Sequence, residues 1–299
     1  MKLFSFKTKE HIVRIGIDLD GQKYDFTQIW DMFKDIQGKH RFPDLYFIQV
    51  MVELGLFNYD DINEVISTVK KLRSLDDLKI RGPIQFDVPV ARPQKIICLG
   101  RNYQKHAAEF NKPVPKEPII FAKMTSSLIP HEGTIILPRN VGRVDHEGEL
   151  ALVISKTGKN IAESKAYEYV AGYTIMNDVT ARAMQIQDIE NKMPWTRTKS
   201  FDTFGPIGPA IVPTKLISNP HQLDITVKVN GEIRQHANTS QMIFKIPELI
   251  QYISRFMTLS PGDIIATGTP EGVSELHDGD VVTVAIDQIG MLENNVIAE

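Results

Sequence analysis

The sequence predicts an α+β protein, mainly β, whose larger part forms a mostly antiparallel, rolled or barrel-like sheet. Beyond residue 94, short apolar or alternating runs are separated by Gly, Pro, Asn and Asp, as is typical of strands. Few helical patterns lie among these runs, whereas a doubly wound parallel sheet needs a crossover helix between strands. A separate, more helical segment precedes this region.

The strand and helix patterns of residues 1–80 predict a small α+β N-terminal domain. Residues 12–26 form a predicted hairpin, because two strand-like runs flank Asp20-Gly21, a dipeptide suited to the positive φ angles of a tight turn. Helical patterns follow at residues 28–37, 44–54 and 60–73. No cluster of catalytic residue types lies in this segment.

Residues 81–94 predict an extended linker. Gly82, Pro83, Pro89 and Pro93 fall within this stretch, and such a density of Pro cannot continue a helix. We therefore expect the domain boundary here, with a second domain over residues 95–299.

The pattern of the second domain predicts a succession of strands, with a further tight hairpin at Asn230-Gly231. The predicted strands are KIICLG, PIIFAK, TIILP, ELALVIS, VAGYTIM, AIVP, DITVKVNGEIRQ, DIIATG and DVVTVAI. The predicted helices are residues 103–110, 162–169, 179–190 and 246–256.

Composition points to a soluble globular protein that acts on a small molecule. The chain has 299 residues, of which 42% are hydrophobic and 24% charged, and its net charge of -3 offers no basic field for nucleic acid or a membrane. Lysines interrupt the apolar residues of the N-terminus, unlike a signal peptide, so a cytoplasmic location is expected. Cys98, the only cysteine, predicts a buried, inert thiol.

Residues 144–154, VDHEGELALVI, place two acids on a strand that is otherwise apolar on both faces. Glu147 and Glu149 share a face with Ala151 and Val153. An unpaired buried carboxylate costs several kcal/mol, so two of them call for a cation. The alternative is a strand end whose acids reach solvent or pair with Lys.

A third acid, Asp178, ends another apolar strand, YTIMND. Three carboxylates without Cys or paired His favour Mg2+ or Mn2+, with Ca2+ possible, over zinc. Lys123, Arg182 and Lys199 are candidates to offset the remaining negative charge, although isolated lysines and arginines are more often solvated.

The segment GRNYQKHAAEF, residues 100–110, supplies a candidate proton-transfer pair. On a helix, His106 and Glu109 lie at i and i+3 and are within reach of each other. A carboxylate beside an imidazole orients it and raises its basicity. By itself the pattern is weak, and the acids downstream give it weight.

Six motifs in order resemble the fumarylacetoacetate hydrolase family, in the subset that acts on acylpyruvates and related 2-oxo acids. They are IICLGRNYQKHAAE, VDHEGELALVI, GYTIMNDVTAR, TKSFDTFGPIGP, VNGEIRQ and IIATGTPEGV, and the resemblance spans roughly residues 94 to 298. It implies a mixed β-roll, a homodimer and a catalytic second domain.

The resemblance also implies roles for particular residues. The metal ligands fall on Glu147, Glu149 and Asp178, and the catalytic residues on His106, Glu109 and Lys199. The implied substrate contacts are Arg101, Tyr103, Lys123, Gln185 and Thr269.

Two positions depart from the family pattern. Ala183 stands where relatives often carry an acid, so a partner that orients Arg182 must come from elsewhere. Met-Thr-Ser-Ser follows Lys123 in place of the commoner loop that begins with Pro or Ser. This difference affects the expected wall of the substrate pocket.

The expected activity is hydrolysis of a carbon–carbon bond of 2,4-dioxo acids (acylpyruvates) through a metal-bound enolate. Oxaloacetate decarboxylation uses the same enolate without water, and isomerisation or tautomerisation of 2-oxo or 2-hydroxy-dienoic acids needs only proton transfer. A non-catalytic metal-binding scaffold is a further alternative, against which the His106, Glu109 and Lys199 set argues.

Overall fold

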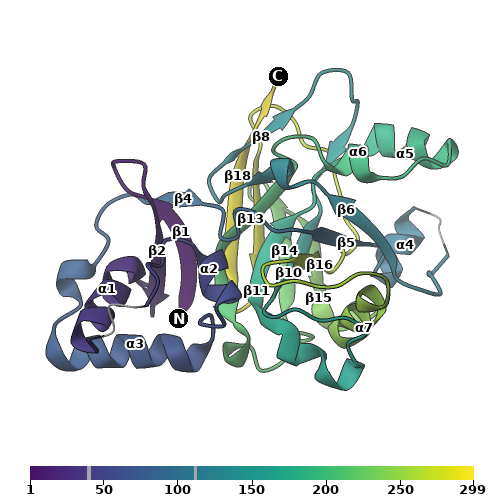
Figure 1. The fold of residues 1–299 in the computed structure, drawn as a ribbon. Helices are drawn as coiled ribbons and strands as arrows, with labels where there is room; N and C mark the ends of the chain where they lie inside the picture. The colour runs from purple at the N-terminus through teal and green to yellow at the C-terminus, as the bar shows by residue number, and fades with distance from the viewer. Residues whose placement is uncertain (39–41, 111–112) are drawn as a thin grey trace.

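The computed structural model describes residues 1–38, 42–110 and 113–299, and it shows an α+β fold dominated by two sheets (Figure 1). The first segment contains β1 Lys2–Lys7, β2 Val13–Leu19, β3 Gln22–Asp25, α1 Phe26–Ile36, α2 Ile48–Glu53, α3 Tyr59–Leu72 and β4 Gln85–Asp87.

The larger segment runs from β5 to β18. Its strands are β5 Ile96–Gly100, β6 Ile119–Lys123, β7 Leu128–Ile129, β8 Thr134–Leu137, β9 Val144–Asp145, β10 Gly148–Ile154, β11 Val170–Asn177, β12 Thr180–Ala181, β13 Gly205–Pro213, β14 Asp224–Val229, β15 Glu232–Asn238, β16 Ile264–Ala266, β17 Val281–Ile286 and β18 Gly290–Ala298. Its helices are α4 Gln104–Glu109, α5 Arg182–Glu190, α6 Thr196–Lys199 and α7 Ile246–Phe256.

The larger sheet is mostly antiparallel, as predicted. In the described residues its strands follow the order β3-β2-β1-β13-β11-β10-β16-β5-β6, with β4 paired to β1 and β7 to β13. Only the β16–β5 and β13–β7 pairs in it are parallel. Because the end strands β3 and β6 are not paired with each other in the described residues, the sheet is a roll and not a closed barrel.

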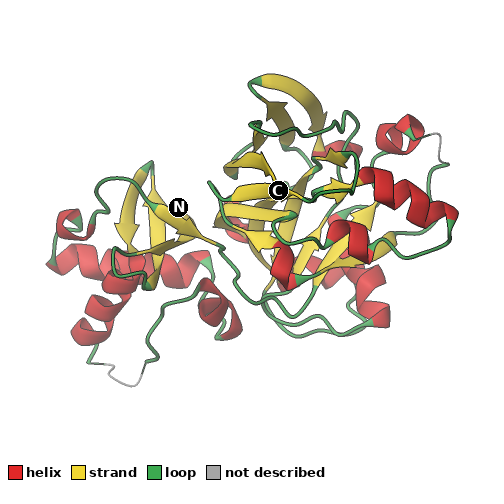
Figure 2. Cartoon of the chain, turned by 90° about the horizontal axis from the view of Figure 1, so that it is seen from above, coloured by secondary structure: helices red, strands yellow, loops and turns green. Residues whose placement is uncertain are grey.

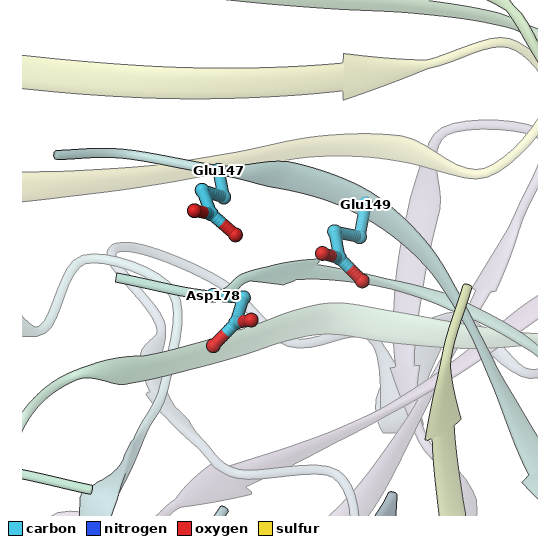
Figure 3. Close-up of side chains that lie close together, drawn as sticks. All are labelled: Glu147, Glu149 and Asp178. Carbon is cyan, nitrogen blue, oxygen red and sulfur yellow. The ribbon is translucent and has the colours of Figure 1, made fainter. Parts of the chain in front are cut away.

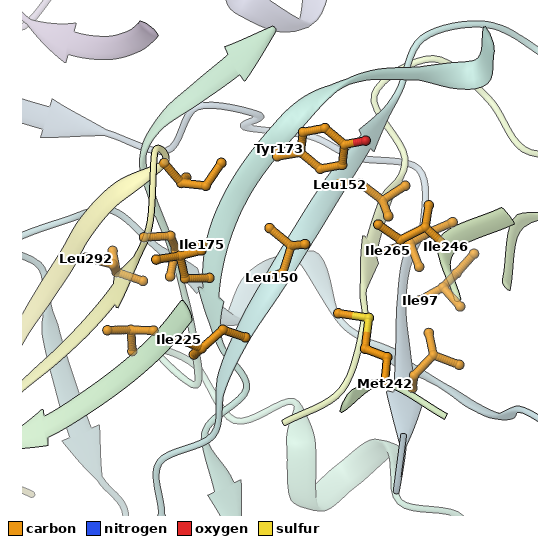
Figure 4. Close-up of a cluster of buried hydrophobic side chains, with 14 of the residues drawn as sticks. Ile97, Leu150, Leu152, Tyr173, Ile175, Ile225, Met242, Ile246, Ile265 and Leu292 are labelled. Atoms are coloured by element: carbon orange, nitrogen blue, oxygen red, sulfur yellow. The ribbon is translucent and has the colours of Figure 1, made fainter. Parts of the chain in front are cut away.

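The smaller sheet packs on one face of the larger one and forms the main core with it. Its order is β15-β14-β17-β18-β8. Leu150 and Leu152 of β10 meet Ile225 and Leu292 of the smaller sheet in this core, together with Tyr173 of β11 (Figure 4). The alternation predicted for residues 144–154 is therefore confirmed, since the even-numbered apolar residues share this face.

The opposite face of β10 belongs to a second core. Ala151 and Val153 lie there, in a cluster that continues to Ile29 of α1 and Val65 of α3. Seen from above, these helices stand beside the N-terminal strands, on the side away from α5 (Figure 2). The strand is thus enclosed on both faces, which explains why the acids at its start are buried.

The predicted hairpin and the three N-terminal helices are present, but the first strand was missed. Residues 2–7 form β1, which pairs with β2 and, through Leu3 and Ile211, with β13 of the larger sheet. The N-terminal strands therefore extend the same sheet. The domain boundary at residues 81–94 stays a prediction, and within this stretch β4 is hydrogen-bonded to β1.

Two predicted helices differ from the observed elements. Residues 163–169 form a 3₁₀ helix, with a single buried side chain, Ala166. The predicted helix at 179–190 begins only at Arg182, because Thr180 and Ala181 pair with Asp145 and Val144 as the short strand β12. This pairing brings the start of α5 to the acids.

No helix within residues 1–38, 42–110 or 113–299 is long and apolar enough to cross a membrane.

The core between the sheets gives a stability prediction. Replacing Leu152, which is fully buried, by Ala should lower the free energy of unfolding by about 2 to 5 kcal/mol, because the substitution loses apolar burial and leaves a cavity. The same substitution at Leu72, which is 66% exposed at the end of α3, should change it by less than about 0.5 kcal/mol. Chemical denaturation of the two variants measures the difference, and equal losses would contradict this packing.

Candidate metal centre and active site

Three carboxylates gather where β10 begins and β11 ends. The strands are antiparallel neighbours with Gly148 opposite Asn177, so Glu147, Glu149 and Asp178 fall at the same edge. One oxygen from each lies within 4.8 Å of the others, and all three residues are buried. Figure 3 shows the side chains pointing toward one another from the two strands.

Backbone contacts fix the two strand ends beside each other. The amide N–H of Glu147 donates to the side-chain oxygen of Asn177 at 2.9 Å, and the amide of Asp178 donates to the carbonyl of Glu147 at 2.8 Å. The acids are consequently held by main-chain geometry, which makes them a preorganised set of ligands.

Two buried lysines lie against these acids. Lys199 Nζ lies 2.7 Å from Glu147 Oε2 and 2.6 Å from Asp178 Oδ2, and Lys123 Nζ lies 2.8 Å from Asp178 Oδ1. Burial lowers the pKa of Lys199, but Asp178 and Glu147 outweigh that effect and raise it above its ordinary value. Both lysines thus offset the charge of the acids, as the sequence suggested.

Arg182 completes the charge balance from the start of α5. Its guanidinium binds Glu147, and its Nε donates to Asp145 Oδ2 at 2.8 Å while Nη1 donates to Gln185 Oε1 at 2.6 Å. Burial tends to raise the pKa of Glu147, but Lys199 and Arg182 hold it well below its usual range.

Asp145 and Gln185 therefore orient Arg182. They are the partners from elsewhere in the chain that Arg182 needs because position 183 carries Ala and not an acid. The chain segment before β9 approaches Ala183 closely, because a Cβ on Gly142 would lie only 2.8 Å from the Ala183 Cβ. A small residue fits this close approach.

Glu149 differs from the other two acids. Its Oε2 accepts a hydrogen bond from the Gly268 amide at 2.8 Å, while its buried Oε1 has no partner among the described residues. Burial raises the pKa of Glu149 well above its ordinary value, and Asp178 and Glu147 raise it further. Gly268 has φ +93° and a Cβ there would lie 2.8 Å from Asn102, so glycine is required.

These observations fit a divalent cation. An oxygen-only set of three carboxylates is suited to a hard ion, and the unpaired Glu149 oxygen lacks the partner that such an ion provides. Glu147, Glu149 and Asp178 are the residues that would hold it.

The predicted pair on α4 is formed. His106 Nδ1 lies 3.1 Å from Glu109 Oε2, and Glu109 Oε1 accepts a hydrogen bond from the Gly272 amide at 3.1 Å. The imidazole is buried and also contacts Phe110, with their ring centroids 5.2 Å apart. Glu109 is thus anchored on one oxygen while it orients His106 with the other.

A cavity of about 610 Å³ is lined by His106 of this pair and by Glu147 of the acid cluster. Several predicted site residues line it, namely Arg101, His106, Glu147, Gln185, Lys199 and Thr269. His106 therefore faces the same space as Glu147.

Two predicted substrate contacts lie outside the cavity lining. The Tyr103 side chain is buried and its hydroxyl has no hydrogen-bond partner among the described residues. Lys123 is buried beside Asp178 and donates to the carbonyl oxygens of Val179 and Lys199. A direct contact of either residue with substrate stays a prediction.

Two supporting residues were missed by the sequence reasoning. Asp145 holds Arg182, and its place two residues before Glu147 in VDHEGEL was the available signal. Gln235 accepts from the Gly148 amide at 3.1 Å and donates to Thr269 Oγ1 at 2.8 Å. Gln235 thus links β10 to the loop after β16. It lies 87 residues from Gly148 in the chain, so no local sequence pattern could reveal this contact.

The acid cluster gives a binding prediction. Glu149→Gln should weaken Mn2+ binding at least about tenfold, because a neutral amide replaces a charged ligand. The melting temperature of the metal-free variant should not fall, since the buried Glu149 carboxylate has an oxygen without a partner.

Titration calorimetry and thermal unfolding measure the two quantities. Glu168→Gln is the matched control, because this side chain is 58% exposed and its ion pair among the described residues is with Lys156 at 3.4 Å. Unchanged Mn2+ affinity in Glu149→Gln would remove this residue from the ligand set.

The chain is similar in sequence and structure to known enzymes. The chain is 47% identical over 224 residues to the oxaloacetate tautomerase fahd2 of Xenopus laevis, covering 73% of this chain and 70% of that protein. The fumarylacetoacetate hydrolase of Exiguobacterium antarcticum superposes with a TM-score of 0.79 at 31% identity, covering 100% of both chains.

A second solved structure carries ligands. Maleylpyruvate hydrolase from Sphingobium sp. SYK-6, in complex with manganese (II) ion and pyruvate, superposes with a TM-score of 0.75 at 30% identity, covering 100% of this chain and 99% of that one. Residues 95–297 match the model of the fumarylacetoacetate (FAA) hydrolase C-terminal domain. The chain therefore belongs to the fumarylacetoacetate hydrolase family of metal-dependent enzymes.

Proposed function

We propose that this protein is a divalent-metal-dependent hydrolase that cleaves a carbon–carbon bond of 2,4-dioxo acids (acylpyruvates) and releases pyruvate. The observation that carries the proposal is that His106, oriented by Glu109, lines the same cavity as Glu147 of the acid cluster. The manganese- and pyruvate-bound maleylpyruvate hydrolase supports it by similarity.

Mg2+ is the proposed metal, and Mn2+ fits the same oxygen ligands. When bound, such an ion acts as a Lewis acid that stabilises negative charge developing on the oxygen atoms of a 2-oxo acid. The chain supplies the remaining elements of the reaction.

Charge in the cavity favours a substrate with one carboxylate. Arg182 and Lys199 are already paired with acids, whereas Arg101 lines the cavity without an ion pair among the described residues. Lys192 and Glu190, which are exposed and also line the cavity, carry opposite charges. Arg101 can therefore bind the carboxylate of an acylpyruvate, whereas Lys192 and Glu190 together add no net positive charge for a second carboxylate.

His106 is placed to activate water. With Nδ1–H donating to Glu109 Oε2, the neutral ring presents Nε2 as a base that takes a proton from a water molecule. The hydroxide adds to the C4 carbonyl, the C3–C4 bond breaks, and its electron pair passes to C3. The proton on His106 then returns to C3, so that water and acylpyruvate give a carboxylic acid and pyruvate.

This role predicts the effect of one substitution. His106→Ala should lower kcat for acetylpyruvate hydrolysis by about a hundredfold to ten-thousandfold, the usual contribution of a positioned base. Mn2+ affinity should stay unchanged, because His106 is not among the predicted ligands.

His277→Ala is the matched control, since His277 is exposed and lies outside the cavity lining. Hydrolysis by His106→Ala at the wild-type rate would show that the histidine does not activate water.

Keto–enol tautomerisation of a 2-oxo acid is the second candidate. The 47% identity to a protein named oxaloacetate tautomerase favours it. The same pair would suffice, because this reaction only moves a proton between C3 and the 2-oxo oxygen. Decarboxylation of oxaloacetate likewise needs no attacking water.

An NMR time course separates these reactions. Acetylpyruvate and oxaloacetate are followed in parallel with Mg2+ and then with excess chelator. We expect acetate and pyruvate from acetylpyruvate, abolished by the chelator. Accelerated enol–keto exchange of oxaloacetate with no cleavage of acetylpyruvate would instead establish the tautomerase, and pyruvate from oxaloacetate alone would establish the decarboxylase.

The expected homodimer and cytoplasmic location stay proposals. Light scattering of the purified protein decides the first, and fractionation of the source cells decides the second.

A further inference from the structure

The cavity has an apolar end that the proposed reaction does not use. Its apolar lining residues include Phe121, Ile186, Ile189, Met193 and Trp195. Ile186, Ile189 and Met193 are 47%, 38% and 41% exposed, which is unusual for neighbouring large apolar side chains of a soluble protein.

Helix α5 runs from the acids toward this end. Arg182 and Gln185 lie at its start, where they contact Glu147 or each other, and Ile186 and Ile189 follow on the same face at helical spacing. With a rise of 1.5 Å per residue, Ile189 lies about 10 Å along the axis from Arg182. Along α5 the lining therefore changes from Arg182 and Gln185 beside the acids to Ile186 and Ile189, before the charged Glu190 and Lys192.

A second part of the cavity lining, formed by Phe121 and Trp195, is apolar even beside the acids. The Phe121 ring centroid lies 4.9 Å from Lys199 Nζ, and the Trp195 ring meets Phe121 edge-on at 5.4 Å. Gly100 leaves the space for this indole, because a Cβ there would lie 2.5 Å from Trp195. The aromatic surface thus extends from Lys199, beside the acids, through Phe121 to Trp195.

We propose that this end binds the acyl group of the substrate, so that the enzyme prefers 2,4-dioxo acids with an alkyl or aryl group larger than acetyl. The inference rests on the proposed acylpyruvate hydrolysis and adds the substrate class. With the carboxylate at Arg101 and the dioxo group beside the acids, a longer acyl chain lies along Ile186, Ile189 and Trp195 and covers their exposed surfaces.

Kinetics with a chain-length series test the preference. The kcat/KM values of acetylpyruvate, butanoylpyruvate and hexanoylpyruvate should rise by about fourfold per added methylene, as expected when each is transferred from water to an apolar surface. In Ile189→Asn the rise should fall to about twofold per methylene or less. Ile233→Asn is the matched control, because Ile233 is 61% exposed on β15 and does not line the cavity; the full gradient should remain.

Binding without turnover gives an independent readout. Pyruvate, 2-oxohexanoate and 2-oxooctanoate cannot be cleaved as 2,4-dioxo acids, so calorimetric Kd values with Mg2+ report the apolar end alone. The wild type should bind the longer acids progressively more tightly, and Ile189→Asn should bind them with a weaker dependence on length.

The outcomes separate the two proposals. A binding gradient without cleavage of any acylpyruvate would overturn the proposed function and keep the apolar subsite. Cleavage of acetylpyruvate with no gradient in kcat/KM or Kd would overturn the subsite alone. Loss of an oligomer in Ile189→Asn with an unchanged gradient would also overturn it, and would assign the exposed side chains to a contact between copies.

Discussion

The structure depends on the cost of burying three carboxylates at one sheet edge. Glu147, Glu149 and Asp178 would repel one another strongly in the interior, so positive charge must accompany them. Lys123, Lys199 and Arg182 provide part of it from three different elements, the end of β6, α6 and the start of α5. Glu149 keeps an oxygen without a partner among the described residues, and a divalent ion would satisfy that requirement.

This requirement also places the cavity. Because Lys199 and Arg182 must reach the acids, α5 and α6 converge there, and the rest of α5 forms a wall of the cavity. Helix α4 lies on the same cavity, with Glu109 bound to the Gly272 amide. The acids are therefore surrounded by the cations Lys199 and Arg182 and by the His106–Glu109 pair that can transfer a proton. The other lining residues can determine which substrate binds.

The parts of the site that share local sequence were predictable. Glu147 and Glu149 alternate with apolar residues on one strand, and His106 and Glu109 lie one helical turn apart, so spacing alone brought each pair together. The strand beginning at residue 2 was missed because its burial comes from pairing with β2 and β13. Likewise Gln235 holds Gly148 and Thr269 through contacts between distant segments, which no local pattern records.

By itself the sequence determined the fold class, the acids and the His–Glu pair, because strand and helix periodicities dictate which neighbouring side chains share a face. Only the tertiary structure decided which distant residues meet them. It turned Lys123 toward Asp178 and away from the cavity, gave Arg182 its partner in Asp145, and set Trp195 against Gly100 and Phe121. The physical reason is that these contacts depend on the packing of segments that are far apart in the chain.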